Sequence, residues 1–347
     1  MSYLQAFVIA LIQGVTELFP VSSLGHSVLV PAWLGGSWQA MVTQSSQQSS
    51  DSSFYLSYIV ALHCATALAL MWFFRADWVR IIRGFFRSLP RSLQQRRLVT
   101  ADKDERLAWM IVLATIPVGL TGVALEHTFR TLFAKPTAAA VLLFVNGFIL
   151  AGAEILRRSR TRRRAEATAV PAAAAPAMAG PGLPTADALS QLPAGRPHSH
   201  RKTSGGRARA DIDAAEQSDA RIARLSYLES IAIGAFQIAA LLAGISRSGI
   251  TMAGGLWRGL DHEDAARFAF LLATPVILAA GVLKIPSLLG PAGAHIHGQV
   301  ALGVVVTAIS AYLSVRFLVR WFQTRTLTPF AIYCIILGAA SIVRFAF

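Results

Sequence analysis

Long apolar runs separated by polar, basic segments dominate the sequence. Six of these runs approach or reach the roughly 20 residues that a helix needs to cross the hydrocarbon core of a bilayer. They are residues 55–74, 107–124, 137–156, 266–284, 299–317 and 328–346. We therefore predict an all-α polytopic membrane protein with six transmembrane helices.

Two further apolar runs, 3–34 and 227–257, are each interrupted by residues that break helices. The first contains Phe-Pro-Val-Ser-Ser at 19–23, and the second contains Ala-Gly-Ile-Ser-Arg-Ser-Gly at 243–249. Proline removes a helical hydrogen bond, and glycine tolerates backbone angles that end a helix. We expect both runs to form re-entrant helical hairpins, although a single tilted span is the alternative for 3–34.

The distribution of positive charge gives the orientation of the spans. Lys and Arg outnumber Asp and Glu by nine to four in 75–106, thirteen to six in 157–224 and three to none in 316–325. Basic loops stay on the cytoplasmic side of a membrane. With these loops inside, 227–257 begins and ends on the cytoplasmic side. Asp77 and Asp261 lie near span ends and are expected to be solvated.

Composition narrows the class of protein. Of the 347 residues, 54% are hydrophobic and 14% are charged, whereas soluble domains carry about 25% charged residues. This composition excludes a soluble enzyme, a disordered protein and a disulfide scaffold. The net charge of +14 lies in the basic loops. We therefore expect contact with anionic membrane lipids and no binding of nucleic acid.

The sequence contains an internal repeat, which appears when Ser2 is aligned with Ser226. This alignment gives ten identities over 2–35, the last of them Gly35 with Gly259. Three spans follow each copy, and the copies start on opposite faces, which is typical of an inverted-topology repeat. The expected units are a first membrane repeat (1–156), a second (225–347) and, between them, a disordered cytoplasmic linker (157–224) rich in Arg, Ala, Pro and Gly.

The first break carries candidate metal ligands. Gln13 and Glu17 stand one helical turn apart and share one helix face, and an ionisable group inside a membrane is a functional candidate. Pro20 ends this helix, so Ser22 or Ser23 caps the next one. His26 follows about one turn later and could act as a base, an acid or a nucleophile.

The second break carries candidate anion ligands. Ser246 can cap a helix, and Gly249 permits close backbone approach. Two helix N-termini aimed at one cavity form an anion site, to which Arg247 adds a planar charged fork. A carboxylate fits beside this site if Mg²⁺ or Ca²⁺ lies between Glu17, the Gln13 carbonyl oxygen and diphosphate oxygens.

Simpler roles are open for several of these residues. Glu17 could form a structural ion pair with Arg247, and His26 could be a buried histidine with satisfied hydrogen bonds. A structural role is favoured for Gln237, because Leu241 stands where the first copy has Glu17. For His63, within a span, polar packing is favoured.

The residues at both breaks resemble the two signatures of a known family. Residues 13–26 (Gln-Gly-Val-Thr-Glu-Leu-Phe-Pro-Val-Ser-Ser-Leu-Gly-His) and 243–249 resemble those of the undecaprenyl-diphosphate phosphatase, or bacitracin-resistance, family. The resemblance implies six spans and two re-entrant hairpins in an inverted repeat. It also implies removal of the terminal phosphate from a C55 isoprenoid diphosphate, which leaves the monophosphate carrier for cell-wall synthesis.

The resemblance implies roles for individual positions. Glu17 and Gln13 match the metal-binding pair, Ser23 and His26 match the proposed nucleophile and acid/base, and Arg247 matches the phosphate-binding arginine. The expected catalytic set is Glu17, Ser23, His26 and Arg247, and the expected phosphate-binding set is Ser22, Ser246, Arg247, Ser248 and Gly249. The chain departs from the family pattern in having Leu24 for a hydroxyl residue, Ala243 for proline and Gln13 for glutamate.

The expected function is thus an integral-membrane phosphatase, with a lipid-phosphate flippase that uses the same anion site as the alternative. The expected partners are a polyprenyl diphosphate, membrane lipids and a second copy of the chain in a homodimer. We expect the protein in the bacterial inner membrane, with its active site opening to the outer face.

Overall fold

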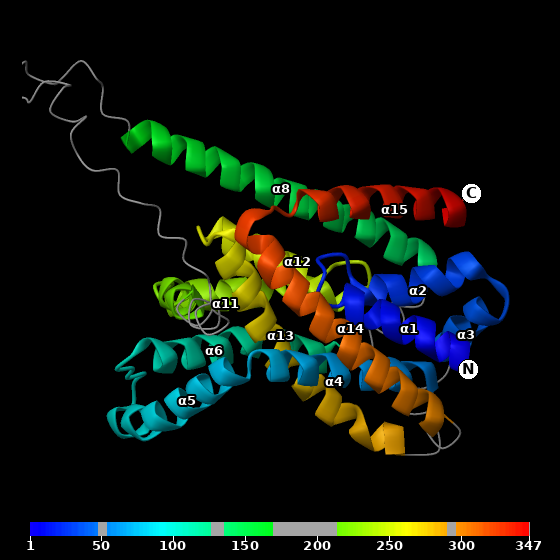
Figure 1. Ribbon diagram of the computed structural model, residues 1–347, viewed down its shortest axis with the longest axis horizontal. Helices are drawn as coiled ribbons and strands as arrows, with labels where there is room; N and C mark the ends of the chain where they lie inside the picture. Colours follow the sequence, from blue (N-terminus) through cyan, green and yellow to red (C-terminus); the bar gives the residue numbers. More distant parts are fainter. Residues whose placement is uncertain (48–53, 126–134, 169–213, 290–295, 347) are drawn as a thin grey trace, which may run out of the picture. The chain divides into compact units, whose positions relative to one another are not determined.

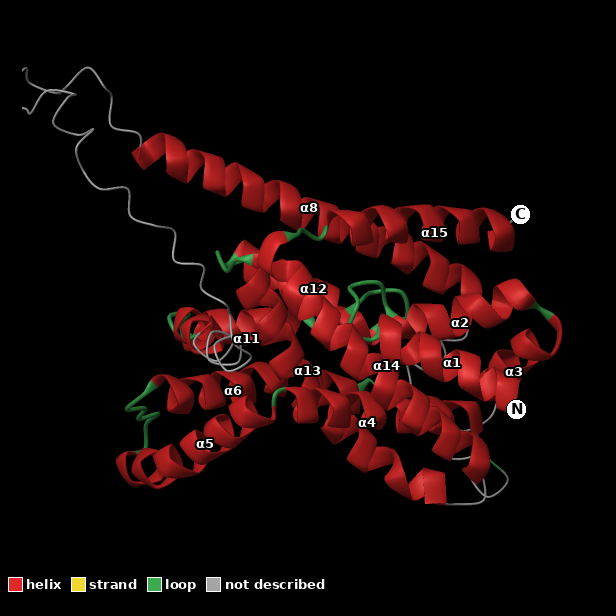
Figure 2. Ribbon diagram, viewed as in Figure 1, coloured by secondary structure: helices red, strands yellow, loops and turns green. Residues whose placement is uncertain are grey.

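The described part of the chain is built from helices (Figures 1 and 2). The computed structural model describes residues 1–47, 54–125, 135–168, 214–289 and 296–346, and these ranges contain no strand. Helices are expected for apolar segments, because a helix bonds its own backbone groups where lipid cannot. The all-α prediction is confirmed.

The helices of the described residues differ in length and follow one another along the chain. They are α1 (Tyr3–Thr16), α2 (Ser23–Leu34), α3 (Gly36–Gln47), α4 (Phe54–Phe73), α5 (Arg75–Gln95), α6 (Lys103–Ala124), α8 (Pro136–Thr168), α11 (Tyr227–Phe236), the short 3₁₀ helix η2 (Ala239–Leu241), α12 (Arg247–Trp257), α13 (His262–Leu289), α14 (His297–Thr324) and α15 (Thr328–Ala346).

Within the described residues, six helices are long and apolar enough to cross a membrane. They are α4, α6, α8, α13, α14 and α15. Each covers one of the six apolar runs, except that α4 ends one residue before the end of the run 55–74. The prediction of six candidate spans is confirmed. The protein is therefore a multi-pass membrane protein.

The run 3–34 forms two short helices, α1 and α2, that pack against each other. They contain 14 and 12 residues, fewer than a full span requires. Near the start of α1, Gln5 Nε2 donates a hydrogen bond to Ser37 Oγ, just beyond α2, at 3.3 Å. The end of α2 therefore lies close to the start of α1 (Figure 1).

Both interrupted runs begin with the same local structure. Ser2 Oγ accepts a hydrogen bond from the Gln5 backbone N–H at 3.1 Å, and Ser226 Oγ accepts one from Glu229 at 3.2 Å. In each case the side chain of the third residue accepts a hydrogen bond from the backbone N–H of the cap serine, which completes a capping box. The repeat thus relates equivalent helix starts as well as identical letters.

Each short first helix packs on a long helix from the other half of the sequence, α1 on α14 and α11 on α6. Both contacts need a glycine. A Cβ at Gly14 would lie 2.0 Å from Ser310 Oγ, and one at Gly234 would lie 2.0 Å from the Ala114 carbonyl oxygen. Small residues allow helix backbones to approach closely where lipid provides no hydrophobic drive for packing.

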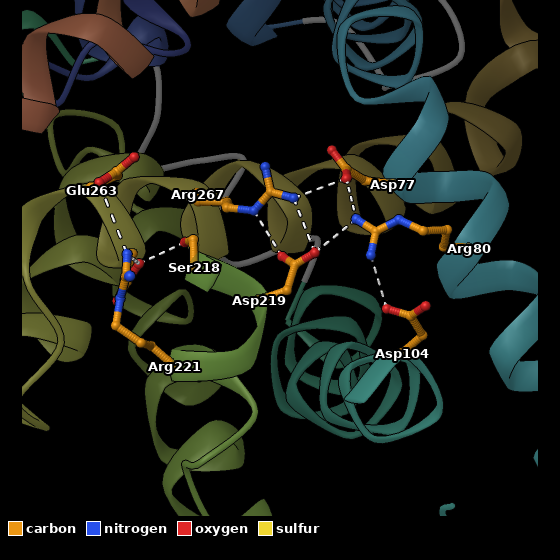
Figure 3. Close-up of polar contacts among 9 residues, drawn as sticks. Asp77, Arg80, Asp104, Ser218, Asp219, Arg221, Glu263 and Arg267 are labelled. Carbon is orange, nitrogen blue, oxygen red and sulfur yellow. Dashed lines mark hydrogen bonds and ion pairs between the residues drawn. The ribbon is translucent and has the colours of Figure 1, made fainter. Parts of the chain in front are cut away.

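A group of five charged residues, which we call the charge cluster, connects four separate segments (Figure 3). Asp219 accepts hydrogen bonds from Arg267 Nε at 2.8 Å and Arg80 Nη2 at 2.9 Å. Arg267 also pairs with Asp77 at 2.9 Å, and Arg80 with Asp104 at 3.0 Å. Burial lowers the pKa of Arg80, but its hydrogen bonds to Asp219 and Asp77 outweigh that effect and raise the pKa.

The charge cluster corrects one expectation. Asp77 was expected to be solvated but is buried, because Arg80 and Arg267 neutralise it from α5 and α13. Sequence position near a span end could not reveal both partners, because Arg267 comes from the second half of the chain.

The chain divides into two compact units, one of residues Met1–Arg157 with Ser218–Phe347 and one of Arg158–Gln217. Residues 169–213 of the predicted linker lie outside the described residues, so its disorder stays a prediction. At the downstream end, Asp219 and Ile222 are buried within the larger unit. The larger unit therefore resumes at Ser218, and the predicted boundary at 225 stays a prediction.

Candidate active site

The two helix breaks, residues 19–23 and 243–249, lie against each other inside the larger unit. We call their contact the junction. The Gly244 backbone N–H donates to Ser22 Oγ at 3.1 Å, and the Ser248 hydroxyl donates to the Phe19 carbonyl at 3.2 Å. A Cβ at Gly25 would lie 3.1 Å from the Gly244 Cα, so both glycines permit this contact. The structure thus brings together two segments that are far apart in the sequence.

Serine side chains start both helices that leave the breaks. Ser22 Oγ accepts a hydrogen bond from Gly25 N–H at 3.2 Å, and Ser246 Oγ accepts one from Gly249 N–H at 3.1 Å. Of the two serines that could cap α2, Ser22 is the cap, and it has a left-handed φ of 70°. Both helix N-termini are therefore at the junction, where they favour an anion.

Glu17 is buried at the centre of the junction and receives donors from both breaks. Arg247 Nη2 donates to its Oε1 at 2.7 Å, and Gln13 Nε2 donates to its Oε2 at 3.0 Å. The Ser23 hydroxyl also donates to Oε2. Four of the predicted site residues thus form one hydrogen-bonded group.

The carboxylate–guanidinium pair is the ion pair that the sequence left open as a structural role. It is buried on the glutamate side, whereas the Arg247 side chain is 20% exposed. Removing either partner would leave an uncompensated charge in a medium of low dielectric constant. An anion that reached Arg247 would compete directly with Glu17 for the same guanidinium.

Both ring nitrogens of His26 have hydrogen-bond partners other than Ser23. Its Nδ1 lies 2.7 Å from the Ser22 carbonyl oxygen, which can only accept, so Nδ1 carries the proton. Its Nε2 lies 2.7 Å from the Tyr333 hydroxyl on α15, and the two rings stack. The histidine therefore contacts α15, and its catalytic role stays a prediction.

A polar crevice and an apolar cavity meet at the junction, and we call the apolar cavity the tunnel. The crevice is lined by Glu17, Ser22, Ser23, Leu24, Ala240, Ile245, Ser246 and Arg247. The tunnel has a volume of about 310 Å³, and its largely apolar wall comes mainly from α2, α4, α13 and the second break. Leu24, Ala240 and Arg247 line both spaces. Polar donors beside an apolar cavity are the pattern expected for a ligand with an anionic head and an apolar tail.

Comparison with known proteins identifies the family. The chain matches the family described as bacitracin resistance protein BacA over residues 6–178 and 205–340. The chain belongs to the BacA family.

Relatives of this BacA-family chain match over almost their whole length. The undecaprenyl-diphosphatase 2 of Frankia alni is 56% identical over 100% of this chain and 98% of its own. The undecaprenyl-diphosphatase of Mycolicibacterium paratuberculosis is 53% identical over 100% and 98%. The undecaprenyl-diphosphatase 2 of Burkholderia lata is 36% identical over 95% and 92%.

The structure adds two residues to the site of this BacA-family chain. Asn146 on α8 is fully buried; its Nδ2 donates to the Pro20 carbonyl at 3.1 Å, and its Oδ1 accepts from Ser246 N–H at 3.0 Å. It therefore ties one break to the other. The available signal was a lone amide in the apolar run 137–156, since buried polar side chains connect membrane helices.

The second added residue is His63 on α4. Its Nε2 lies 3.2 Å from Glu17 Oε2, and its Nδ1 lies 2.8 Å from the Ile59 carbonyl oxygen. His63 also lines the tunnel. The sequence favoured a packing role, because its spacing within a span does not reveal that it faces the carboxylate.

Proposed function

We propose that the protein is an integral-membrane phosphatase that hydrolyses undecaprenyl diphosphate to undecaprenyl phosphate and inorganic phosphate. This activity recycles the lipid carrier for cell-wall synthesis and thereby confers resistance to bacitracin. The observation that carries the proposal is the meeting of Glu17, Ser23 and Arg247 in a crevice at the head of an apolar tunnel. The names of the relatives favour this activity over the flippase.

The arrangement of crevice and tunnel supports one orientation of the lipid. The isoprene units next to the diphosphate lie in the tunnel, and the terminal phosphate enters the crevice beside Arg247 and the N-termini of α2 and α12. Fixed donors aimed at a transferring phosphoryl group stabilise its charge without reorganisation. Ser246, Ser248 and Gly249, at the start of α12, would then complete the phosphate-binding set.

The hydrogen bond from Ser23 to Glu17 supports Ser23 as the nucleophile. The Ser23 oxygen attacks the terminal phosphorus, and its proton passes to Glu17. The bond from this phosphorus to the bridging oxygen breaks, and its electron pair leaves with the lipid monophosphate. Water then attacks the phosphorus of the phosphoserine. The bond from the Ser23 oxygen to phosphorus breaks, the Ser23 oxygen takes back the proton from Glu17, and the released phosphate keeps both protons of the water. His26 stays the second predicted acid/base, and it would have to leave Tyr333 to act.

The residues around Glu17 suit a divalent cation, Mg²⁺ or Ca²⁺, that takes some of its ligands from the protein and the others from the substrate. Gln13 Oε1 is buried and has no hydrogen-bond partner among the described residues, although its own amide nitrogen bonds Glu17. One carboxylate and one amide oxygen are too few for a closed site, but Mg²⁺ commonly takes one or two carboxylates plus substrate phosphates. Gln13 and Glu17 would hold the ion, which neutralises diphosphate charge when bound.

We also propose that α1–α2 and α11–α12 are re-entrant hairpins of an inverted repeat. Their short helices, matching capping boxes and reciprocal packing on α14 and α6 support this topology. The site would open to the outer face of the bacterial inner membrane. A homodimer stays a prediction.

The direct test is phosphate release from C55 diphosphate by purified protein in detergent, with and without a chelator. Wild-type protein should release phosphate, and the chelator should abolish release until Mg²⁺ or Ca²⁺ is restored. Ser23→Ala and Glu17→Ala should each reduce kcat by about 100-fold or more. Full activity in both variants, with unchanged melting temperatures, would refute the proposed mechanism.

A further inference from the structure

One buried side chain near the junction has no assigned task. Gln237 ends α11 and is 1% exposed, yet neither its Nε2 nor its Oε1 has a hydrogen-bond partner among the described residues. An amide at this depth costs free energy unless it is paired. The structural role that the sequence favoured would require a protein partner for this amide, and the described residues provide none.

The tunnel is the place where Gln237 can find a partner. Gln237 contributes to the tunnel wall together with Arg247 and His63, whereas it is not among the residues that line the crevice. The neighbouring wall residue Leu241, one helical turn on, is apolar. A polar group of a ligand would therefore meet Gln237 on the tunnel side of Arg247.

The repeat shows how the two copies differ at this position. Gln13 and Gln237 are equivalent when Ser2 is aligned with Ser226. Gln13 bonds Glu17, but the second copy has Leu241 in place of that carboxylate. Both amide atoms of Gln237 can therefore bond a ligand, whereas the Gln13 nitrogen already bonds Glu17.

We infer that Gln237 binds the phosphate that is attached directly to the lipid. This inference rests on the proposed function, because it assumes that the terminal phosphate occupies the crevice. The next phosphate along the substrate then lies at the mouth of the tunnel, between Arg247 and the isoprenoid chain. There the Gln237 amide N–H donates to it. Because this phosphate remains on the product, Gln237 holds both substrate and product in register.

The test measures binding of undecaprenyl monophosphate, which carries only the lipid-linked phosphate, by thermal shift in detergent. Undecaprenol, which has no phosphate, is the control ligand. In Gln237→Met the lost hydrogen bond to a charged group should weaken binding of the monophosphate about tenfold, with binding of undecaprenol unchanged. Gln237→Glu should weaken it further through repulsion of the phosphate.

A matched variant separates ligand binding from structural support. Gln5 is also a buried glutamine, but its amide bonds Ser2 and Ser37, so Gln5→Met should lower the melting temperature and leave monophosphate binding unchanged. Gln237→Met should leave the melting temperature of the ligand-free protein unchanged or raise it.

A lowered melting temperature with unchanged binding in Gln237→Met would overturn the inference. So would a wild-type protein that the monophosphate does not stabilise. Phosphate release by the wild type is measured separately, so loss of the proposed activity is distinguishable from failure of this inference.

Discussion

At the scale of single residues, the geometry of Arg247 decides how the crevice binds phosphate. Its guanidinium donates to Glu17 and is flat and forked, whereas a lysine ammonium is a point charge. Arg247→Lys should therefore keep the charge but lower kcat/KM for C55 diphosphate by about 100-fold. Phosphate-release kinetics measure this effect.

Arg258 provides the control for that substitution, because it lies just beyond α12 and over the exposed ring of Trp257. Arg258→Lys should leave the kinetics within about twofold of wild type, since a surface cation–π contact contributes about 0.5–1 kcal/mol. Equal losses in both variants would show that a general effect on folding, rather than the fork at Arg247, limits the reaction.

Asn146 should affect the reaction without touching the phosphate. Its amide holds the Pro20 carbonyl and the Ser246 N–H at once, so Asn146→Leu should let the two breaks shift apart. We expect kcat for phosphate release to fall about tenfold or more, since small misplacements of catalytic groups are costly. Cys334→Ala, which removes two weak sulfur contacts, one to Asn146 at 3.4 Å and one to the Pro20 carbonyl at 3.8 Å, should retain activity; if it loses as much, local packing is the cause.

At the scale of elements, the charge cluster connects α5, α6 and α13 with the segment that leads into α11. Asp219 is its buried centre, so Asp219→Asn would remove one of the two carboxylates that Arg267 and Arg80 share and leave only Asp77 between them. Breaking a buried ion pair costs about 3–5 kcal/mol. The melting temperature in detergent should fall clearly.

Asp102→Asn is the matched change at the surface. The Arg87–Asp102 pair is about half exposed and should contribute less than about 1 kcal/mol, and asparagine caps α6 as well as aspartate does. If both variants lowered the melting temperature equally, the cluster would have no special role in connecting these elements.

The elements also show why sequence predicted the breaks better than their surroundings. Apolar length gives the spans, and proline, glycine and serine mark where α2 and α12 begin, because these effects act within a few residues. Arg267, which pairs with Asp77, and Tyr333, which bonds His26, come from distant helices. No local pattern encodes which helix α5 or α15 will face.

At the scale of the whole molecule, the repeat explains how sequence could predict the junction of Glu17 and Arg247. Each copy's short helix packs on a long helix from the other half of the sequence, α1 on α14 and α11 on α6, and this reciprocal packing is consistent with the contact between the two equivalent breaks. The repeat could not predict the differences between copies. Asn146 and His63 come from helices outside the repeated segment 2–35. Gln237 has no carboxylate partner of the kind that Gln13 has in Glu17.

The proposed topology predicts which face of the membrane each hairpin reaches. Gln5 contacts Ser37, so the two ends of the first hairpin should lie on the same side. Single cysteines at Ser2 and Ser37, in a background of Cys64→Ala and Cys334→Ala, should both react with an impermeant thiol reagent added from outside. A single tilted span would instead expose the two positions on opposite faces, and only one of them would react.

The second hairpin should give the opposite result because the copies are inverted. Arg224 and Arg258 lie just outside its two ends, and both are exposed. Cysteines at these positions should be protected in intact cells and should react once the membrane is opened. Reaction of all four positions from outside would mean that both hairpins enter from one face. Glu17 and Arg247 would then have to meet without the inverted repeat, and the resemblance between the two breaks would not be a consequence of membrane symmetry.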